Sequence, residues 1–436
     1  MSLKKKIAEK TAKIGVIGLG YVGLPLAVEK AKVGYTVLGF DIMPSRVDMV
    51  NRGENYIGDV IQADLEKVVQ DFALTATGDF TRLEECDIIS ICVPTPLDSY
   101  KQPDLSCVTE SAKQIRNHMK PDTLVILEST TYPTTTESVL LPILEAHGKK
   151  CGTDFYLAFS PERVDPGNKL YNTKNTPKVV GGVDNTSTEL AKMLYETVLS
   201  ANVKTVSTTK EAEFSKILEN TFRIVNISLI NELAILADKM GVNIWEVIDA
   251  AATKPFGFMP FYPGIGVGGH CIPIDPFYLT FIAQKYNLTT SMIRAAGEIN
   301  DKMPAYTVER ISRILNNQKI ALKESSILMV GIAYKGDISD VRESPALKVY
   351  QQLNEMGAYV DVVDPYVESF EYNGQMIKTI KLTPFSLKSV DIVVIATAHK
   401  ENVNYSLIYE KAKMIFDTKN IFSNLGFSKK SNIYVL

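Results

Sequence analysis

A cysteine-containing loop near the middle of the chain is the first candidate for chemistry. Residues 263–276 surround Cys271 with four glycines and three prolines. Glycines let a ligand approach the backbone, and a thiol in such a loop can act as a nucleophile when its thiolate form is favoured. The alternative is a buried, inert cysteine, which is the commoner situation for this residue type. Neighbours in an extended segment point in opposite directions, so we expect His270 to contact backbone or substrate rather than the thiol.

A second candidate is a pair of polar residues on a predicted helix. Lys216 and Asn220 are four residues apart and share one helix face, from which both could reach a single anionic oxygen. The alternative is a solvated lysine beside a polar neighbour. Because the following turns are overwhelmingly apolar, the helix is predicted to lie deep in the protein, which favours the functional interpretation.

A glycine-rich turn near the start of the chain predicts a dinucleotide site. Gly18, Gly20 and Gly23 have GxGxxG spacing, follow an apolar run and open a helical segment, which makes a purely structural turn the less favoured alternative. Such a turn brings backbone N–H groups to a pyrophosphate at the positive end of a helix. Asp41, at the end of the next apolar run, would bind the adenine ribose and repel a 2′-phosphate. NAD is therefore favoured over NADP, although Arg46 could cover the adenine or tolerate that phosphate.

The elements that must position these residues alternate between apolar runs and helical segments, which predicts an α/β protein. Residues 1–205 read as a doubly wound Rossmann domain that binds NAD, and residues 319–436 as a second Rossmann-like domain. Between them, residues 206–318 read as a central helical domain, which we expect to form a homodimer interface. In the third region Ala333 replaces the middle glycine and Lys335 adds a positive charge, so a different phosphate ligand is expected there.

Composition narrows the classes of partner. The net charge is −3 and the basic residues are scattered, which argues against binding to nucleic acid or to an anionic membrane. No apolar run reaches the roughly 18 residues that a membrane span needs, and no apolar signal core is present, so a cytoplasmic location is predicted. The five cysteines lack CxxC spacing, which predicts neither a disulfide framework nor a metal site. The four cysteines other than Cys271 are predicted to be inert thiols in strands or at strand ends.

Several short motifs resemble those of a known family. They are VPTP at 93–96, EST at 128–130, SPER at 160–163, the helix with Lys216 and Asn220, GGHCIPID at 268–275, and YKGD at 334–337 running into RES at 342–344. Together with the glycine turn they span nearly the whole chain, which resembles the UDP-glucose/GDP-mannose dehydrogenase family of UDP-sugar 6-dehydrogenases. The resemblance implies an NAD domain, a central helical dimer core and a UDP-binding domain, the same plan as predicted above.

The resemblance also implies catalytic roles. Cys271 would be the nucleophile in a four-electron oxidation of the sugar C6 alcohol to a carboxylate with two NAD in turn, through a thiohemiacetal and a thioester. Lys216 and Asn220 would stabilise the tetrahedral oxyanion. Asp275 and Thr130 would position water or handle protons, and which of them is the base stays open.

Binding residues follow from the same resemblance. Glu162 would be the acid near the nicotinamide and the reacting carbon. Lys335 would contact the UDP diphosphate and Arg342 the NAD pyrophosphate, unless both lie on a solvated loop. The predicted NAD-binding residues are Gly18, Gly20, Tyr21, Val22, Gly23, Asp41, Arg46, Pro94, Thr95, Thr130 and Arg342. The predicted residues for the UDP-sugar substrate are Glu162, Arg163, Val164, Lys216, Asn220, Phe261, Tyr262, Gly268 and Lys335.

Two segments predict the sugar. RVDPGN at 163–168 stands where UDP-glucose enzymes usually have Phe-Leu and a second acid, and FGFMPFYP at 256–263 also resembles the branch that acts on 2-acetamido sugars. UDP-N-acetylglucosamine is favoured on residues 165–168, with UDP-N-acetylmannosamine and UDP-glucose as alternatives. A one-step hydroxy acid dehydrogenase would leave Cys271 and the third domain without a role. A non-catalytic binding protein is disfavoured because no catalytic residue is missing.

Overall fold

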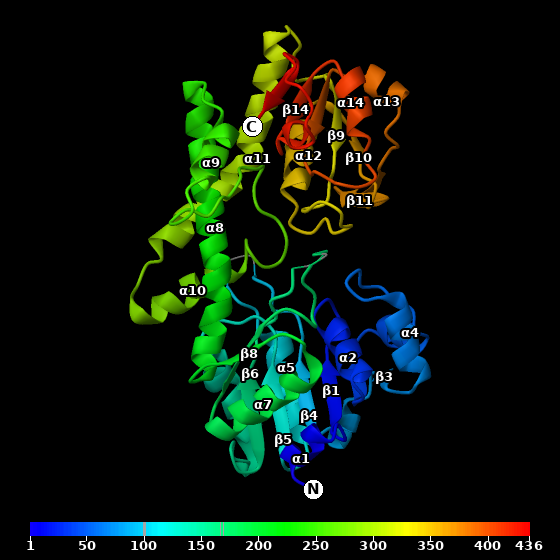
Figure 1. Ribbon diagram of the computed structural model, residues 1–436, viewed down its shortest axis with the longest axis vertical. Helices are drawn as coiled ribbons and strands as arrows, with labels where there is room; N and C mark the ends of the chain where they lie inside the picture. Colours follow the sequence, from blue (N-terminus) through cyan, green and yellow to red (C-terminus); the bar gives the residue numbers. More distant parts are fainter. Residues whose placement is uncertain (99–101, 166, 169) are drawn as a thin grey trace. The chain divides into compact units, whose positions relative to one another are not determined.

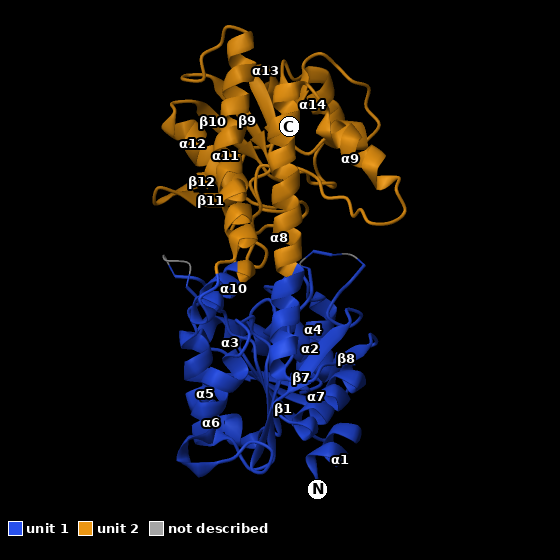
Figure 2. Ribbon diagram, turned by 90° about the vertical axis from the view of Figure 1, so that its left-hand side faces the viewer, with its two compact units in different colours: residues 1–219, 277–288 blue, residues 220–276, 289–436 orange. Residues whose placement is uncertain are grey.

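The computed structural model describes residues 1–98, 102–165, 167–168 and 170–436, which divide into two compact units (Figure 2). Unit 1 contains Met1–Glu219 and Phe277–Leu288, and unit 2 contains Asn220–Pro276 and Thr289–Leu436. Pro166, one of the residues on which the sugar prediction rests, lies outside the described residues.

Unit 1 is built on an eight-stranded sheet with the order β3-β2-β1-β4-β5-β6-β7-β8 (Figure 1). Its first six strands have the order of a doubly wound fold, which reverses direction between β1 and β4. Neighbouring strands are parallel except β6 and β7, which are antiparallel. The strands are β1 Lys13–Ile17, β2 Thr36–Phe40, β3 Leu74–Thr77, β4 Ile88–Ile91, β5 Thr123–Leu127, β6 Phe155–Phe159, β7 Lys178–Gly182 and β8 Val203–Thr205.

Helices cover both faces of this sheet, as buried parallel strands require. They are α1 Leu3–Ala8, α2 Gly23–Lys32, α3 Pro44–Asn51, α4 Gln62–Gln70, α5 Ser106–His118, α6 Leu141–Glu145 and α7 Asn185–Val198. Apolar residues of α1, α2, α4 and α7 pack in one cluster, and those of α5 and α6 in another. Cys107 lies in α5, so its predicted place in a strand is wrong. The buried Val108, Ala112 and Ile115 have the spacing of a helix face, which decides the local structure.

Two long helices, α8 Thr209–Met240 and α11 Ser291–Asn317, and two shorter ones, α9 Ile244–Ala252 and α10 Asp275–Ala283, form the helical part of the chain. In unit 2, α8 and α11 are joined by buried polar contacts. Asn231 Nδ2 donates to Asn300 Oδ1 at 2.9 Å, and Ser228 Oγ donates to the Ala296 carbonyl at 2.9 Å. Because buried polar groups need partners, these bonds specify the register of the two helices.

Unit 2 contains a second sheet, which is parallel and has the order β10-β9-β13-β14-β15. Its strands are β9 Ser326–Val330, β10 Tyr359–Val363, β13 Ile392–Ile395, β14 Ile415–Asp417 and β15 Ile433–Val435, with a separate hairpin of β11 Ser369–Tyr372 and β12 Gln375–Lys378. The accompanying helices are α12 Pro345–Glu355, α13 Pro384–Lys388, α14 Tyr405–Lys411 and α15 Ile421–Asn424. The predicted fold class, with two doubly wound Rossmann-like regions and a helical region between them along the chain, is confirmed.

Candidate active site

The glycine turn between β1 and α2 has the geometry of a dinucleotide site. A Cβ added at Gly18 would lie 2.7 Å from the Cys92 carbonyl oxygen, and one at Gly23 would lie 1.8 Å from the Gly18 carbonyl oxygen. These two glycines are therefore required by the tight turn and by the close approach of helix to strand. A Cβ at Gly20 would meet nothing within 4 Å, which leaves its backbone accessible to a pyrophosphate. The turn thus fits the phosphates of NAD.

Asp41, directly after β2, is held in place beside this turn. Its Oδ2 accepts a hydrogen bond from the Leu19 N–H at 2.9 Å, and Arg46 Nη1 lies 3.5 Å from the same oxygen. Sequence reasoning missed Tyr56, whose hydroxyl donates to the Leu19 carbonyl at 2.7 Å. Burial, reinforced by the charge of Asp41, raises the pKa of Tyr56 to about 12, so this hydroxyl remains a donor at neutral pH. The Asp41 carboxylate and the Tyr56 hydroxyl together hold the backbone of Leu19, the residue after Gly18.

Replacing Asp41 with asparagine should weaken NAD binding and reduce the preference for NAD over NADP. The change removes a charged acceptor for the ribose hydroxyls, and a hydrogen bond to a charged group contributes about 1.5–3 kcal/mol, which corresponds to roughly 10- to 100-fold in the KM for NAD. Initial rates at varied NAD and NADP would measure both effects. Asp48→Asn, at an exposed position on α3, is the matched control. An unchanged KM for NAD in the Asp41 variant would contradict the assignment.

The loops after β4 and β5 are tied together at the carboxyl edge of the first sheet. Thr95 Oγ1 donates to the Thr130 carbonyl at 2.6 Å, and Ser129 Oγ donates to the Val93 carbonyl at 2.7 Å. The Tyr278 hydroxyl, from α10, donates to the Thr95 carbonyl. The structure therefore brings together two predicted NAD-binding residues, Thr95 and Thr130, beside the exposed Pro94.

Glu162 follows β6 and is held from two sides. Its Oε1 accepts hydrogen bonds from the N–H groups of Arg163 at 2.7 Å and Val164 at 2.8 Å, while its Oε2 lies 3.3 Å from Lys178 Nζ. Arg163 forms an ion pair with Glu219 on α8 at 2.7 Å. Sequence reasoning did not single out Lys178, because a lysine at the start of a strand has no local signature of burial.

Cys271 is exposed and lies in a turn that leads into α10. Its carbonyl accepts hydrogen bonds from the Ile274 N–H at 3.2 Å and the Asp275 N–H at 2.8 Å. The side chain of Asp275 is 3% exposed, and its Oδ2 accepts a hydrogen bond of 2.6 Å from Asn220 Nδ2. Lys216, 7% exposed, precedes Asn220 by four residues on the same continuous helix. The predicted thiol, carboxylate and amide are thus neighbours within unit 2.

The glycines of the thiol loop are explained by close packing within unit 2. A Cβ added at Gly268 would lie 2.7 Å from the Glu343 carbonyl oxygen, and one at Gly269 would lie 2.8 Å from the Tyr334 ring. His270 Nε2 lies 3.5 Å from Asp340 Oδ2, a side-chain partner that sequence reasoning did not predict. These contacts hold the thiol loop against the segment that carries two predicted phosphate-binding cations.

Those cations are Lys335 and Arg342. Arg342 Nη2 lies 2.7 Å from Asp340 Oδ2. Although burial opposes it, hydrogen bonds from His270 and Arg342 hold the pKa of Asp340 well below its usual range, so this carboxylate stays ionised. Asp340 therefore links the predicted pyrophosphate contact to the residue that precedes the thiol.

The loop after β9 differs from the glycine turn of unit 1 in the hydrogen bonds made by its neighbouring carboxylate, Asp364. Asp364, after β10, accepts hydrogen bonds at one oxygen from the Ile332 N–H at 2.8 Å and the Ala333 N–H at 3.2 Å, and His399 Nε2 lies 3.1 Å from that oxygen. Its other oxygen accepts two further backbone N–H groups. A carboxylate offers about four acceptor positions, so Asp364 has no capacity left for ribose hydroxyls. This supports a different ligand for the second sheet, as the Ala333 substitution predicts.

Lys419 is a cation that sequence reasoning missed. A Cβ added at Gly264 would lie 2.9 Å from its Nζ, so the amine reaches the beginning of the thiol loop. Burial lowers the pKa of Lys419 to about 8, although Asp417 opposes the shift. No motif surrounds this lysine in the sequence, and only the return of the chain after β14 brings it to the loop.

The predicted substrate residues Phe261 and Tyr262 are packed against the helices of unit 2. The Phe261 ring lies 5.8 Å from that of Phe222 on α8, and the Tyr262 ring stacks on Trp245 of α9 at 5.4 Å. The Tyr262 hydroxyl also donates to Asp249 Oδ1 at 2.9 Å. These aromatic residues are therefore anchored before any ligand binds.

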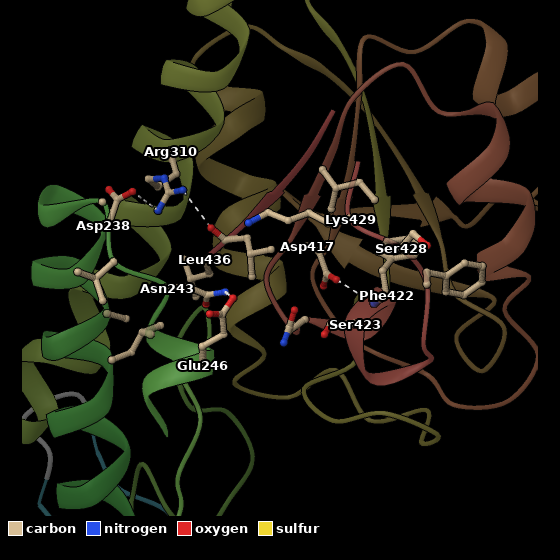
Figure 3. A pocket seen from close by; sticks show the side chains of 18 residues that line it. Asp238, Asn243, Glu246, Arg310, Asp417, Phe422, Ser423, Ser428, Lys429 and Leu436 are labelled. Atoms are coloured by element: carbon tan, nitrogen blue, oxygen red, sulfur yellow. Dashed lines mark hydrogen bonds and ion pairs between the residues drawn. The ribbon is translucent and has the colours of Figure 1, made fainter. Parts of the chain in front are cut away.

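A separate cavity of about 510 Å³ lies in unit 2, between the ends of α8 and α9 and the chain after β14 (Figure 3). Asp238 and Arg310 lie side by side in its lining, with Asp238 Oδ1 2.7 Å from Arg310 Nη1, and Arg310 also donates to the Val435 carbonyl at 3.0 Å. Its lining includes none of the predicted catalytic, NAD-binding or substrate residues. The cavity is thus distinct from the residues around Cys271.

Two further findings concern the described part of the chain. No helix there has both the length and the apolar character needed to cross a bilayer. No group of three or more His, Cys, Asp or Glu side chains is arranged there to hold a metal ion.

Comparison with known proteins identifies the family. Models for the UDP-glucose/GDP-mannose dehydrogenase family match residues 12–199 (NAD binding domain), 210–302 (central domain) and 328–424 (UDP binding domain). The chain is 37% identical over 396 residues to a UDP-N-acetyl-D-glucosamine 6-dehydrogenase of Pseudomonas aeruginosa, covering 91% of this chain and 92% of that protein. It is 36% identical over 445 residues to a UDP-N-acetyl-D-mannosamine dehydrogenase of Methanocaldococcus jannaschii, covering 97% and 96%.

A solved structure agrees with this assignment. The UDP-D-ManNAc dehydrogenase from Pyrococcus horikoshii superposes with a TM-score of 0.87 at 36% identity, covering 97% of this chain and 98% of that one. With matches to all three domains and an NAD-binding turn of the required geometry, the chain belongs to the UDP-glucose/GDP-mannose dehydrogenase family and is an NAD-dependent oxidoreductase that acts on a CH–OH group.

Proposed function

We propose that this enzyme oxidises the C6 alcohol of a UDP-N-acetylhexosamine to the corresponding uronic acid in two successive NAD-dependent steps, with UDP-N-acetylglucosamine as the favoured substrate. The observation that carries the proposal is the arrangement around Cys271. An exposed thiol precedes α10, and the carboxylate one turn later, Asp275, is bonded to Asn220 at 2.6 Å. A one-step alcohol oxidation requires no nucleophile, whereas oxidation to the acid does.

The residues of the chain perform distinct parts of this reaction. NAD, when bound at the glycine turn, would supply the hydride acceptor for each of the two oxidations. The Cys271 thiolate adds to the aldehyde and forms a thiohemiacetal. Loss of the second hydride leaves a thioester, which water cleaves to the acid and the free thiol. Lys216 and Asn220 donate to the tetrahedral oxyanion that arises on the way.

Protons are handled by a small set of oxygen-bearing groups. Asp275 and Thr130 are the candidates for activating the hydrolytic water, and Asp275 has the stronger case because a carboxylate accepts a proton more readily than a hydroxyl. Glu162 serves at the reacting carbon. Lys335 binds the UDP diphosphate and Arg342 the NAD pyrophosphate, in both cases as a cation beside phosphate oxygens.

The assay that tests the function follows NADH formed per sugar consumed, with purified protein, NAD and UDP-N-acetylglucosamine. We expect close to two NADH per sugar and a uronic acid product. One NADH per sugar with an aldehyde product would contradict the two-step route. Parallel reactions with UDP-N-acetylmannosamine, UDP-N-acetylgalactosamine and UDP-glucose identify the sugar. This comparison is needed because relatives named for the gluco and manno sugars are similarly close, at 37% and 36% identity.

The proposal includes three domains and a homodimer. The domains are residues 1–205 for NAD, 206–318 for dimerisation and 319–436 for the UDP-sugar. The dimer is supported by α8, where apolar side chains at helical spacing are exposed in unit 2: Phe222 46%, Leu229 48%, Leu233 39%, Leu236 52% and Met240 66%. A stripe of this length on one 32-residue helix is typical of an interface between two copies.

Replacing Leu229 and Leu233 together with aspartate should convert the dimer to a monomer. Two charges in the middle of an apolar interface cannot be desolvated without partners, which costs several kcal/mol. Light scattering coupled to size-exclusion chromatography measures the mass directly. Lys239→Asp, which changes charge on the same helix outside the stripe, is the control. A monomeric wild-type protein, or a double variant that remains dimeric, would contradict this interface.

A further inference from the structure

Unit 1 contains a chain of four charged side chains with alternating sign. Lys30 on α2 lies 3.7 Å from Glu128 Oε1, Lys178 on β7 lies 2.8 Å from Glu128 Oε2, and Lys178 lies 3.3 Å from Glu162 Oε2. The exposed fractions of the four side chains are 0% for Lys30, 0% for Glu128, 6% for Lys178 and 15% for Glu162. The four formal charges cancel, and the most exposed of the four side chains is Glu162, the carboxylate proposed to serve at the reacting carbon.

Further titratable groups of unit 1 lie against these four side chains. The Tyr195 hydroxyl on α7 donates to Glu128 Oε1 at 2.7 Å, and Lys30 donates to Ser90 Oγ at 2.7 Å. Burial raises the pKa values of Tyr195 and Cys92 well above their usual ranges, so both stay neutral. Although burial opposes it, the charges of Lys178 and Lys30 hold the pKa of Glu128 below its usual range. Burial lowers the pKa of Lys30, although the charge of Glu128 opposes the shift. The charge of Glu128 raises the pKa of Lys178, although burial opposes it.

Such an arrangement needs a reason other than stability. Removing charges from water costs several kcal/mol each, and well-packed apolar side chains often stabilise a core as well or better. The two lysines differ in their contacts. Of the two, Lys178 contacts both the fully buried Glu128 and the partly exposed Glu162. Lys30 contacts Glu128 alone among these carboxylates. The two lysines are therefore equivalent in burial but different in what they touch.

Hydrogen bonds to both oxygens hold the Glu162 carboxylate in one orientation. The N–H groups of Arg163 and Val164 bind Oε1, and the Lys178 ammonium binds Oε2. All three are donors, so both oxygens of the carboxylate act as acceptors. Because Lys178 donates to Glu128 Oε2 at 2.8 Å, the ammonium cannot move away from Glu162 without taking that partner from a buried carboxylate oxygen, since the other two contacts of Glu128 are at Oε1.

We propose that Lys178, anchored by Glu128, is a positioning residue that keeps Glu162 ionised and aimed at the reacting carbon, and that this is why the four charges are buried. The inference rests on the proposed function, since it assigns Glu162 a part in the reaction. It adds two residues, Lys178 and Glu128, that act through Glu162 and touch neither substrate nor NAD in this role. Glu162 then works as a proton acceptor in the resting enzyme.

The test compares Lys178→Met with Lys30→Met. Removing Lys178 should lower kcat by roughly 10- to 100-fold, less than the ~10²–10⁴ contributed by a general acid or base itself, with little change in the KM for NAD. The acid limb of the kcat profile should move to higher pH by about 1–3 units, because Glu162 loses the cation that opposes its protonation. Lys30→Met removes an equally buried cation from the same cluster, and its acid limb should not move.

Two further variants keep the test decisive if Lys178→Met does not fold. Lys178→Arg preserves the charge and should restore most of kcat and the wild-type pH profile. Lys178→Gln can still donate a hydrogen bond but carries no charge, and should show the shifted profile. In the double variant with Glu162→Gln, loss of Lys178 should add little, since both changes act on one group. Equal shifts in the Lys30 and Lys178 variants, or additive losses in the double variant, would overturn the proposal.

A second readout separates this inference from the function on which it rests. Infrared titration of the wild-type protein minus Glu162→Gln reports the ionisation of Glu162 without any substrate, and in the Lys178→Met background the carboxylate band should be lost at higher pH. An unshifted titration would overturn the positioning role even if the enzyme is active. Wild-type protein that reduces no NAD with any of the UDP-sugars would instead overturn the proposed function, and the titration would still decide the role of Lys178.

Discussion

Cys271→Ser should stop the reaction before the acid is formed. Serine has nearly the same size, but its hydroxyl is far less acidic than a thiol and does not form the adduct needed for the second oxidation. We expect steady-state formation of the uronic acid to fall by about 10³-fold or more, as loss of a nucleophile does in enzymes that use covalent intermediates. NADH per sugar should fall from close to two to one or less.

The measurement combines NADH stoichiometry with intact-protein mass spectrometry of quenched reactions. The wild-type protein should carry a transient adduct with the mass of the acylated sugar nucleotide, and the serine variant should not. Cys107→Ser is the matched control, because Cys107 is a free thiol that is not fully buried and lies on α5. A Cys271 variant that still forms two NADH per sugar would rule out the thioester route, while loss of activity in the Cys107 variant would point to a general effect of thiol removal.

Asn220→Ala should have the second largest effect. Its amide donates to Asp275 at 2.6 Å, and the same side chain is proposed to donate to the oxyanion together with Lys216. Removal of one oxyanion donor typically costs roughly 10²- to 10³-fold in kcat. Asp275 would also lose a hydrogen-bond donor in a site where it is 3% exposed. We therefore expect kcat to fall by that factor or more, with a smaller change in the KM for NAD.

The control for this prediction lies on the same helix. Asn226 donates its amide to the Phe222 carbonyl at 2.7 Å on the surface of α8, so Asn226→Ala tests the effect of removing an asparagine from that helix without touching the site. Lys216→Met provides an independent loss of the other proposed donor. If Asn220→Ala keeps wild-type kcat, Asn220 is not an oxyanion donor. If its loss is matched by Asn226→Ala, the effect comes from the helix.

Local patterns in the sequence were sufficient for much of the fold. The alternation of apolar runs and helical segments that predicts an α/β protein includes apolar runs at 14–17, 87–93, 123–128, 359–364 and 391–396, which form β1, β4, β5, β10 and β13. The residues predicted to be helical, 206–318, include α8 and α11. A buried strand needs a continuous apolar run and a helix needs a periodic one, and both are visible in a single stretch of chain. The antiparallel pairing of β6 with β7 was not predicted, since it depends on partners elsewhere in the chain. The β11–β12 hairpin was missed although its signal is local, because Asn373-Gly374 is a typical two-residue hairpin turn.

The residues of the candidate site also differ in whether their role depends on local or on distant parts of the sequence. Gly18, Gly20 and Gly23 could be interpreted from the sequence because their backbone requirements are local to one turn. The role of Lys178 could not be interpreted from the sequence, since its two carboxylate partners, Glu128 and Glu162, are 50 and 16 residues away in the chain. A lysine at the start of a strand is ordinarily solvated, and only the folded sheet places it between two acids.

What the sequence by itself determined, then, is which residue types and local turns are available for the chemistry: a thiol in a glycine loop, an amide and an ammonium one helical turn apart, and a phosphate-binding turn. What only the tertiary structure decided is which charges meet. The bond between Asn220 and Asp275, the ion pair of His270 with Asp340, and the saturation of Asp364 by backbone N–H groups all join segments distant in sequence. Electrostatic and hydrogen-bond partners are chosen by proximity in space, and local sequence patterns carry no information about that proximity.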